Sequence, residues 1–424
     1  MFPEDKGQIA FISVHGDPSI EIGKEEAGGQ NVYVRQVGEA LAKRGWQVDM
    51  FTRRTQPNQD TIVEHAPGCR TVRLTAGPEA FVGRDELFDH LPDFVESFLK
   101  FQHQTETIYP LLHTNYWLSG WVGLRVREHQ PCKLIHTYHS LGAVKYHEVS
   151  DIPPIATTRL DIEKDCLENV DCVVSTSPQE KSDMRSLVSQ NGTIEIIPCG
   201  TDIERFGRID QTAAREKLGL APQTDVIVYV GRFDPRKGIE TLVRAMAHPA
   251  MQQHPEAQLF IIGGSRPGHK DGEERDRIEG IVQELGLGDR ITFTGRVKHD
   301  DLPVYYAAAN VCVLPSHYEP FGLVAIESMA SGTPVVASEV GGLKFTVVSE
   351  ETGLVVPAKD VAAFADAMHQ ILSNPAWQAE LGQAGRTRVE SHFSWDGVAA
   401  QLDELYLSHL AELWDTFASP SVVS

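Results

Sequence analysis

The cations Arg232 and Lys237 follow the apolar run Val226–Val230, in the segment Gly231–Gly238. Arg232 and Lys237 stand five positions apart, directly after what reads as a buried strand. An arginine offers a forked pair of donors and a lysine a point charge, so both could hold a diphosphate at the end of the strand. A solvated basic turn is the alternative. It is disfavoured because the chain as a whole is acidic and because the cations follow a buried strand.

Two carboxylates form a second pattern, in the segment Ser316–Glu327. Glu319 precedes a predicted helix, and Glu327 lies on that helix. Carboxylates accept hydrogen bonds from diols, so both residues suit sugar hydroxyls. By themselves the two glutamates would more simply be a helix-capping charge and a solvated side chain. The start of the helix also offers free N–H groups to a phosphate. The residues that would provide them are Phe321, Gly322 and Leu323.

A glycine pair precedes another predicted helix, in Gly28-Gly29-Gln30. Two glycines let a ligand approach the backbone, and a helix N-terminus favours an anion. The segment is not the G-x-G-x-x-G fingerprint of dinucleotide-binding proteins. A loop that merely turns the chain is an equal alternative.

Polar side chains crowd the segment His136–Lys145, which follows another predicted strand. They include His139, Ser140 and Lys145. A lone histidine is usually structural, but this crowding favours a functional loop.

The chain has no D-x-D motif, since no two aspartates stand two positions apart. Such a motif would grip a nucleotide diphosphate through a divalent ion. If a diphosphate binds, Arg232, Lys237 and helix dipoles must neutralise it. We therefore expect neither a metal nor a cofactor.

The elements that must position these motifs follow from the alternation of short apolar runs with helical patterns, which is typical of parallel α/β sheets. Val34, Val37 and Leu41 mark the apolar face of a helix after the glycine pair. The strands expected in the first half are Ile9–Val14, Val48–Thr52, Thr71–Leu74, Leu134–His136, Cys172–Thr176 and Ile194–Pro198.

The alternation restarts after an expected linker at Pro198–Gly207. Helices are expected at Leu323–Ala330 and Ala362–Leu372. A last helix should run from Trp395 to about Trp414, before a frayed tail from Thr416 to Ser424. The strands of this half are Val226–Val230, Leu259–Ile262, Ile291–Phe293, Val311–Leu314 and Pro334–Ala337. Val398, Leu402, Leu405 and Leu413 should form the apolar stripe of the last helix.

The sequence thus predicts two doubly wound α/β domains, residues 1–200 and 201–394, and a C-terminal helix and tail at 395–424. Ligands of such folds bind beyond the carboxyl ends of the strands and at domain interfaces. The motifs above all follow strands, as this rule requires.

The amino-acid composition excludes several classes of protein. The 424 residues carry 38 Lys and Arg against 59 Asp and Glu, a formal net charge of −21. This argues against a nucleic-acid binder and against attachment to anionic lipid. No signal peptide and no membrane-length apolar run is found, so we expect a cytoplasmic protein. Six scattered cysteines predict buried free thiols.

Together these motifs resemble those of the retaining glycosyltransferases of the GT-B fold. The N-terminal half is most similar to the sucrose-phosphate synthase family, through Ile12–Gly16, Gly28–Gln30 and His139–Lys145. Asn31–Val34 and Tyr116–Gly120 also resemble the inositol-phosphate glycosyltransferases of the mycothiol pathway. The other matching patterns are G-R-x-x-x-x-K, E-P-F-G-L-x-x-x-E, V-x-S-E-V-G-G and the closing F-S-W helix.

The resemblance implies two Rossmann-like domains that face each other across a cleft, with the last helix crossing back to the first domain. It also implies a role for each motif residue. Arg232 and Lys237 would hold the donor diphosphate, Glu319 the transferred glucose and Glu327 the ribose. His139 would touch the donor sugar beside the anomeric carbon. The base would be read by the backbone near Val297, and the reaction centre lined by Gly29 on the donor side and Gln30 on the acceptor side.

The implied acceptor is a sugar phosphate, held by Arg84, Tyr116, Ser140, Lys145 and Arg159. Arg84 departs from the lysine that these families usually place there, which changes the geometry of the phosphate contact. The implied reaction moves glucose from a nucleotide-glucose, with UDP-glucose favoured, to fructose 6-phosphate and retains the anomeric configuration. Inositol phosphate and free fructose are alternative acceptors. Dephosphorylation of the product would need a separate sucrose-phosphate phosphatase.

Two other classes compete with this hypothesis. A nicotinamide oxidoreductase would show G-x-G-x-x-G after a strand, and neither Gly28-Gly29 nor Gly263-Gly264 fits. A non-catalytic sensor of nucleotide sugars would have lost its catalytic side chains, whereas both halves of this chain keep theirs.

Overall fold

An eight-stranded sheet in the order β3-β4-β2-β1-β5-β6-β7-β8 forms the centre of the first of two units in the computed structural model. Unit 1 comprises residues 1–198 and 395–424, and unit 2 comprises residues 199–394. The structure describes residues 6–20, 28–147 and 152–418. Every described pair of strands in this sheet is parallel except β3–β4. The strands are β1 Gly7–Ile12, β2 Trp46–Arg53, β3 Ile62–Ala66, β4 Cys69–Leu74, β5 Leu111–Asn115, β6 Lys133–Thr137, β7 Cys172–Ser175 and β8 Ile194–Ile196.

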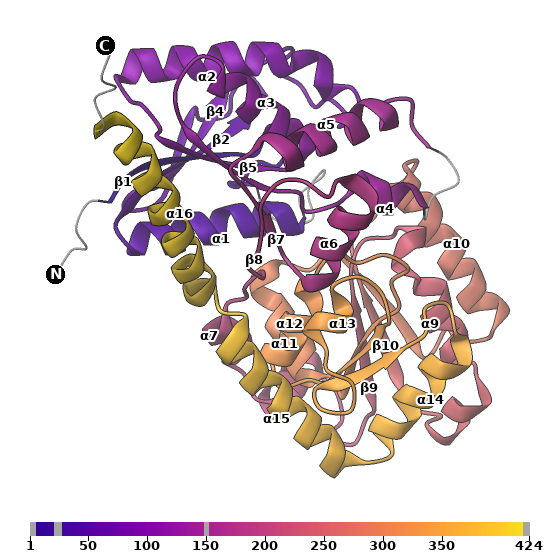
Figure 1. Ribbon diagram of the computed structural model, residues 1–424. Helices are drawn as coiled ribbons and strands as arrows, with labels where there is room; N and C mark the ends of the chain where they lie inside the picture. Colours follow the sequence, from indigo (N-terminus) through magenta and orange to yellow (C-terminus); the bar gives the residue numbers. More distant parts are fainter. Residues whose placement is uncertain (1–5, 21–27, 148–151, 419–424) are drawn as a thin grey trace, which may run out of the picture. The chain divides into compact units, whose positions relative to one another are not determined.

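Helices cover both faces of this sheet, with α2 and α3 on one side and α1 on the other (Figure 1). The face of α1 predicted from Val34, Val37 and Leu41 is confirmed, since all three side chains are fully buried. They pack at the spacing of one helical stripe. The helices of unit 1 are α1 Gly29–Lys43, α2 Leu91–Thr105, α3 Trp117–Arg127, α4 Gly142–His147, α5 Ala156–Asn169, α6 Pro178–Asp183 and α16 Trp395–Ala418.

Unit 2 contains a six-stranded parallel sheet in the order β11-β10-β9-β12-β13-β14. Its strands are β9 Val226–Val230, β10 Gln258–Ile262, β11 Ile291–Gly295, β12 Val311–Leu314, β13 Val335–Ser338 and β14 Gly353–Val356. Its helices are α7 Ile203–Phe206, α8 Gln211–Leu218, α9 Ile239–Met246, α10 Lys270–Glu284, α11 Leu302–Ala308, α12 Leu323–Ala330, α13 Leu343–Thr346, α14 Val361–Leu372 and α15 Pro375–His392.

Each sheet has one point where the chain reverses the direction in which it adds strands. In unit 1 that point lies between β1 and β5, and in unit 2 between β9 and β12. At such a point the loops after two neighbouring strands leave in opposite directions and open a crevice for a ligand. The predicted pair of doubly wound sheets is confirmed, and their topology indicates where each unit binds.

Some details differ from the predictions. The strands β3, β5 and β14 were not predicted, and the expected linker at Pro198–Gly207 contains the short helix α7. The last helix continues to Ala418, so Thr416 to Ala418 are helical rather than frayed. Residues 419–424 lie outside the described residues. The apolar stripe of α16 was partly wrong, because Leu405 and Leu413 are only half-buried. Its buried side chains include Val398, Leu402, Tyr406 and Leu410.

A buried carboxylate fixes α16 within unit 1. Asp403 is 4% exposed, and its two oxygens accept hydrogen bonds from Trp46 Nε1 at 2.8 Å, Lys6 Nζ at 2.7 Å and Arg44 Nε at 3.1 Å. Burial alone would raise the pKa of Asp403, but these three donors outweigh it and lower the pKa. The carboxylate is therefore bound in its charged form.

We expect Asp403→Ala to lower the free energy of unfolding by about 1–3 kcal/mol, because the substitution leaves the buried Trp46 donor without a partner. Urea unfolding followed by tryptophan fluorescence measures this, with the exposed neighbour Glu404→Ala as control. In the wild type, the contribution of Asp403 is fully present above its unfolded pKa of about 4. It is lost as the pH falls through the lowered folded value. An equal midpoint for both variants would contradict this account.

All six cysteines are free and buried, as predicted. None of the helices in the described part of the chain combines the length and the hydrophobicity that a bilayer crossing needs.

Candidate functional site

The loops after β9 and β12 meet at the reversal point of unit 2. Lys237 Nζ lies 2.5 Å from Glu319 Oε2, so the predicted diphosphate cation and the predicted sugar carboxylate are neighbours. Gly238 makes this approach possible. Its φ is +68°, and a Cβ there would lie 2.0 Å from the carbonyl oxygen of Pro315. Only glycine fits at that position without moving the backbone.

The cations around Lys237 have different surroundings. Arg236 forms an ion pair with Asp234, whose side chain also accepts the Arg236 backbone N–H at 3.0 Å. Burial would raise the pKa of Asp234, but Arg236 outweighs this effect and lowers the pKa. Arg232 is exposed and close enough to Asp234 to contribute to the same lowering. Arg236 is thus committed to shaping the loop.

Glu327 is not the solvated glutamate that the simpler interpretation would require. It is 8% exposed, and its Oε2 accepts a hydrogen bond from Tyr306 OH at 2.9 Å. Its Oε1 lies 3.2 Å from His299 Nε2. Because Arg205 can only donate and reaches His299 Nδ1 at 2.9 Å, His299 must carry its proton on Nε2 and donate to Glu327. Val297 stands two residues before this histidine.

The start of α12 is the place where an anion site was predicted. Its first turn follows Gly322, which has φ +97°, and no side chain caps the helix. The backbone N–H groups there are available to an anion in the manner of other helix N-termini. Phe321 is 4% exposed and packs on Phe393 with ring centroids 5.7 Å apart, so its side chain belongs to the core. Only its backbone can serve the site.

Three loops of unit 1 meet at the other reversal point, after β1, β5 and β6. Gln30 Nε2 donates to Ser13 Oγ at 3.0 Å and to the Asn115 carbonyl oxygen at 3.4 Å. His139 Nε2 lies 2.8 Å from Asn115 Oδ1. The side chains of Gln30 and His139, which come from different segments of the sequence, are therefore joined through Asn115.

Two residues of these loops have strained backbones. Tyr116 has φ +77° and ψ 156°, and His139 has φ +60°. Non-glycine residues in such conformations cost of the order of 1–3 kcal/mol each and gather at functional sites. Burial also lowers the pKa of His139 to about 3, so the imidazole is neutral near pH 7.

Arg159 is not a solvated surface charge. It is 2% exposed and donates from Nε to Glu163 at 2.7 Å, from one terminal nitrogen to Tyr116 OH at 3.1 Å and from the other to the Ser140 carbonyl oxygen at 2.6 Å. Glu163 also accepts the Gly142 N–H at 2.9 Å. The structure thus brings three of the five predicted acceptor residues together, and they are Tyr116, Ser140 and Arg159.

The remaining two predicted acceptor residues lie near this group. Arg84 and Arg159 both lower the pKa of His15, after the larger effect of burial. The imidazole of His15 packs on the Tyr116 ring, with centroids 4.6 Å apart. Lys145 stands on α4 and acts electrostatically on Glu163, the partner of Arg159. The cations Arg84, Lys145 and Arg159 therefore all lie around Tyr116, together with the carboxylate of Glu163.

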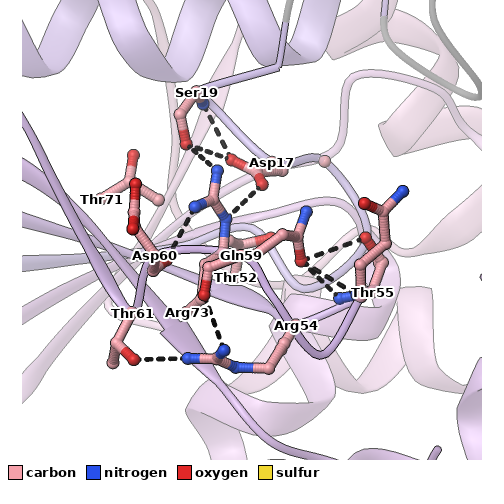
Figure 2. Close-up of polar contacts among 12 residues, drawn as sticks. Asp17, Ser19, Thr52, Arg54, Thr55, Gln59, Asp60, Thr61, Thr71 and Arg73 are labelled. Carbon is pink, nitrogen blue, oxygen red and sulfur yellow. Dashed lines mark hydrogen bonds and ion pairs between the residues drawn. The ribbon is translucent and has the colours of Figure 1, made fainter. Parts of the chain in front are cut away.

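A polar network holds Asp17 and Ser19, which follow β1, against Arg73 of β4 (Figure 2). Asp17 accepts hydrogen bonds from the Ser19 N–H at 2.8 Å, from Ser19 Oγ at 2.6 Å and from Arg73 Nε at 2.8 Å. The carbonyl of Asp17 accepts from Asn31 Nδ2 at 2.9 Å, and Asn31 Oδ1 accepts from the Gly28 N–H at 3.1 Å. A buried ion pair between Asp17 and β4 thereby fixes the entry to α1, where Gly29 and Gln30 lie.

Gly28 itself is not required by the turn. Its backbone is extended, with φ −155°, and a Cβ there would meet nothing within 4 Å. Among the described residues there is room for a side chain at Gly28, so this geometry does not distinguish a ligand-binding loop from one that merely turns the chain.

Three residues of these sites were missed at the level of sequence: Asn115, His15 and His299. Asn115 ends β5, so recognising that strand would have placed it at the carboxyl edge. His15 follows β1, and neither its residue type nor its position indicated a role. His299 bonds Glu327 across 28 positions, and no local pattern signals that contact.

Two family models match the chain. The one described as glycosyl transferases group 1 covers residues 210–388, and the glycosyl transferase 4-like domain covers residues 28–200. Among curated proteins, the chain is 35% identical over 410 residues to the D-inositol 3-phosphate glycosyltransferase of Corynebacterium glutamicum (strain R). That match covers 95% of this chain and 97% of the relative.

Among solved structures, the chain is similar to sucrose-phosphate synthase from Thermosynechococcus elongatus, at 54% identity and a TM-score of 0.89. The match covers 96% of this chain and 100% of the other. HepE of Anabaena, solved in complex with UDP and glucose, matches at 20% identity and a TM-score of 0.75, covering 94% of this chain and 99% of that one. The last similarity concerns the fold alone.

Proposed function

Because the chain belongs to the group 1 glycosyltransferases and has their GT-B fold, we propose that it moves glucose from UDP-glucose to fructose 6-phosphate, giving sucrose 6-phosphate. The similarity to a sucrose-phosphate synthase at 54% identity, along nearly the whole chain, supports this acceptor. The inositol-phosphate enzymes match at 35% over a similar length.

The observation that carries the choice of a phosphorylated acceptor is the positive charge around Tyr116. Arg84 and Arg159 both act on His15 beside this tyrosine, and Arg159 is buried. Arg159 already pairs with Glu163 at 2.7 Å, so a phosphate would add to this network and would also attract the nearby charges of Arg84 and Lys145. A phosphate dianion accepts charge-assisted hydrogen bonds that a neutral sugar cannot make, so free fructose should be a poor substrate.

On the donor side, Arg232 and Lys237 hold the diphosphate, and the N–H groups at the start of α12 add to its neutralisation. Glu327 binds the ribose, Glu319 the glucose, and the backbone near Val297 the base. As the bond between the anomeric carbon and the diphosphate breaks, negative charge grows on the leaving phosphate. Fixed cations that wait for this charge lower the barrier.

No carboxylate in the described part of the chain is assigned as a nucleophile. We therefore propose front-face displacement with retention. The acceptor hydroxyl attacks the anomeric carbon on the side that the diphosphate leaves. The leaving phosphate takes the hydroxyl proton, so UDP and sucrose 6-phosphate are released without any proton left on the protein.

A matrix of UDP-, ADP- and GDP-glucose against fructose 6-phosphate, free fructose and inositol phosphate tests this assignment, with the products identified by NMR. We expect sucrose 6-phosphate from UDP-glucose and fructose 6-phosphate as the fastest reaction. Faster transfer to inositol phosphate would move the assignment to that acceptor. Binding of the nucleotide sugar without any product would make the chain a sensor.

The two glutamates should separate nucleotide binding from turnover. We expect Glu327→Ala to weaken the binding of UDP by about tenfold, since it removes a charge-assisted contact to the ribose. Glu319→Ala should leave UDP affinity within about twofold of wild type and lower kcat, because the proposed partner of Glu319 is the transferred sugar. Titration calorimetry with UDP measures the first effect and steady-state kinetics the second. Equal losses of UDP affinity in both variants would contradict the separation.

A further inference from the structure

Asn115 is a fully buried residue at the carboxyl end of β5, and its amide has a fixed orientation. Its Nδ2 donates to the carbonyl oxygen of His113 at 3.2 Å. The side-chain oxygen must therefore be the atom that faces His139, at 2.8 Å from Nε2. An amide oxygen can only accept a hydrogen bond, so His139 has to donate from Nε2.

This contact decides the state of the His139 imidazole. A neutral ring carries one proton, and placing it on Nε2 leaves a lone pair on Nδ1. No hydrogen bond from another described residue reaches that Nδ1. Burial lowers the pKa of His139, which keeps the ring neutral.

The backbone around this pair is also held in place. Asn115 precedes Tyr116, and both Tyr116 and His139 have positive φ values. The Tyr116 N–H donates to the Thr137 carbonyl oxygen at 2.8 Å, which ties the end of β5 to the end of β6. The Asn115 carbonyl also accepts from Gln30. Asn115 thus contacts Gln30 through its backbone carbonyl and His139 through its side-chain oxygen, and it directly precedes the strained Tyr116.

We propose that Asn115 is a positioning residue for glucosyl transfer, which holds His139 as the neutral Nε2–H tautomer and so presents its Nδ1 lone pair to a hydroxyl of the transferred sugar. The inference rests on the proposed function for the identity of that sugar. The tautomer and its cause rest on the geometry of unit 1 alone.

The first test is NMR of protein labelled with ¹⁵N-histidine and without substrate, with the His139 signals assigned by comparison with His139→Gln. We expect wild-type His139 to be the Nε2–H tautomer and to stay largely neutral as the pH is lowered from 8 to 4. In Asn115→Asp, a carboxylate replaces the amide oxygen and should raise the pKa of His139 by about one to three units. An Nδ1–H tautomer in the wild type, or an unchanged titration in Asn115→Asp, would overturn the inference.

The second test is the pH profile of kcat. Asn115→Ala should lower kcat by about tenfold at pH 7.5, and Asn115→Asp should recover most of that loss because its histidine is again held and neutral. In Asn115→Asp, kcat should fall on the acid side with a midpoint at the pKa that NMR finds for His139. Equal kcat for the alanine and aspartate variants at all pH values would indicate a merely structural residue and overturn the inference.

Asn169→Asp is the matched control, because Asn169 is an exposed asparagine at the end of α5 whose side chain bonds only Asp165 within the described residues. Its pH profile should follow the wild type. Failure of the proposed function is seen separately, in the acceptor preference of the wild-type enzyme. The NMR result does not depend on which acceptor that is.

Discussion

Lys237→Ala is expected to lower kcat/KM by about 100-fold or more, which is the scale of losing one fixed charge stabiliser in an active site. Lys237 Nζ lies against Glu319 even without a ligand. The ammonium is therefore already positioned after β9 before the substrate binds. Such a group stabilises the leaving phosphate at no cost of reorganisation. The loss should appear mostly in kcat, since the charge on the phosphate grows during bond cleavage.

Arg244→Ala is the matched control, on the helix that follows this loop. Arg244 is a half-exposed cation of α9 that pairs with Glu240 and has no proposed contact with the diphosphate, so kcat/KM should stay within about threefold of wild type. The assay is also to be run with excess chelator, where we expect full activity, since the proposed function assigns neutralisation of the diphosphate to Arg232 and Lys237. Activity that disappears in chelator and returns with magnesium would contradict that part of the proposal.

Arg84→Ala should raise KM for fructose 6-phosphate by between roughly tenfold and a hundredfold. One charge-assisted hydrogen bond to the phosphate contributes about 1.5–3 kcal/mol, and about 1.4 kcal/mol corresponds to tenfold. KM for UDP-glucose should change by less than about twofold. Initial rates with either substrate varied separate the two constants, and the exposed Lys100→Ala serves as control. A similar rise in both KM values would place Arg84 outside the acceptor site.

To test whether Arg159 also contacts the acceptor phosphate, a substitution other than alanine is needed. Its removal leaves Glu163 buried without its ion partner, which typically destabilises a protein by about 3–5 kcal/mol. Arg159→Lys keeps a charge beside Glu163 but loses the fork that reaches Tyr116 and Ser140. Its KM for fructose 6-phosphate should rise as in Arg84→Ala, with a thermal midpoint closer to wild type than that of Arg159→Ala.

The strands that could be predicted from the sequence are those with apolar surroundings along their whole length. β9 reads Val-Ile-Val-Tyr-Val and was predicted to the residue, because a parallel strand covered on both faces is apolar along its whole length. β5 was missed because His113, Thr114 and Asn115 are polar. His113 is buried through bonds to Thr137 and to Tyr406, which lies 293 positions away. A local sequence pattern cannot predict a hydrogen-bond partner so far away in the chain.

The residues of the candidate site also fall into those that local sequence indicates and those that depend on long-range contacts. Lys237, Glu319 and Glu327 could be found because each belongs to a loop or helix that directly follows a strand. The pairing of Arg159 with Glu163 was also readable in principle, since the two stand four positions apart on one helix. The proton on His299 could not be predicted, because it depends on a guanidinium 94 positions away. Local motifs thus indicate which residues belong to the candidate site. Contacts between distant parts of the sequence determine where a side chain such as His299 carries its proton.

The chain leaves unit 1 at residue 198 and returns to it at residue 395. During synthesis, the whole of unit 2 is therefore translated before α16 emerges from the ribosome. Until α16 has been translated, Asp403 and Tyr406 are missing. Trp46 Nε1 and His113 Nδ1 then lack these hydrogen-bond partners, on a sheet that α16 does not yet cover. The insertion thus sets an order of maturation, in which the later half of the sequence can be finished while the earlier half still awaits its last helix.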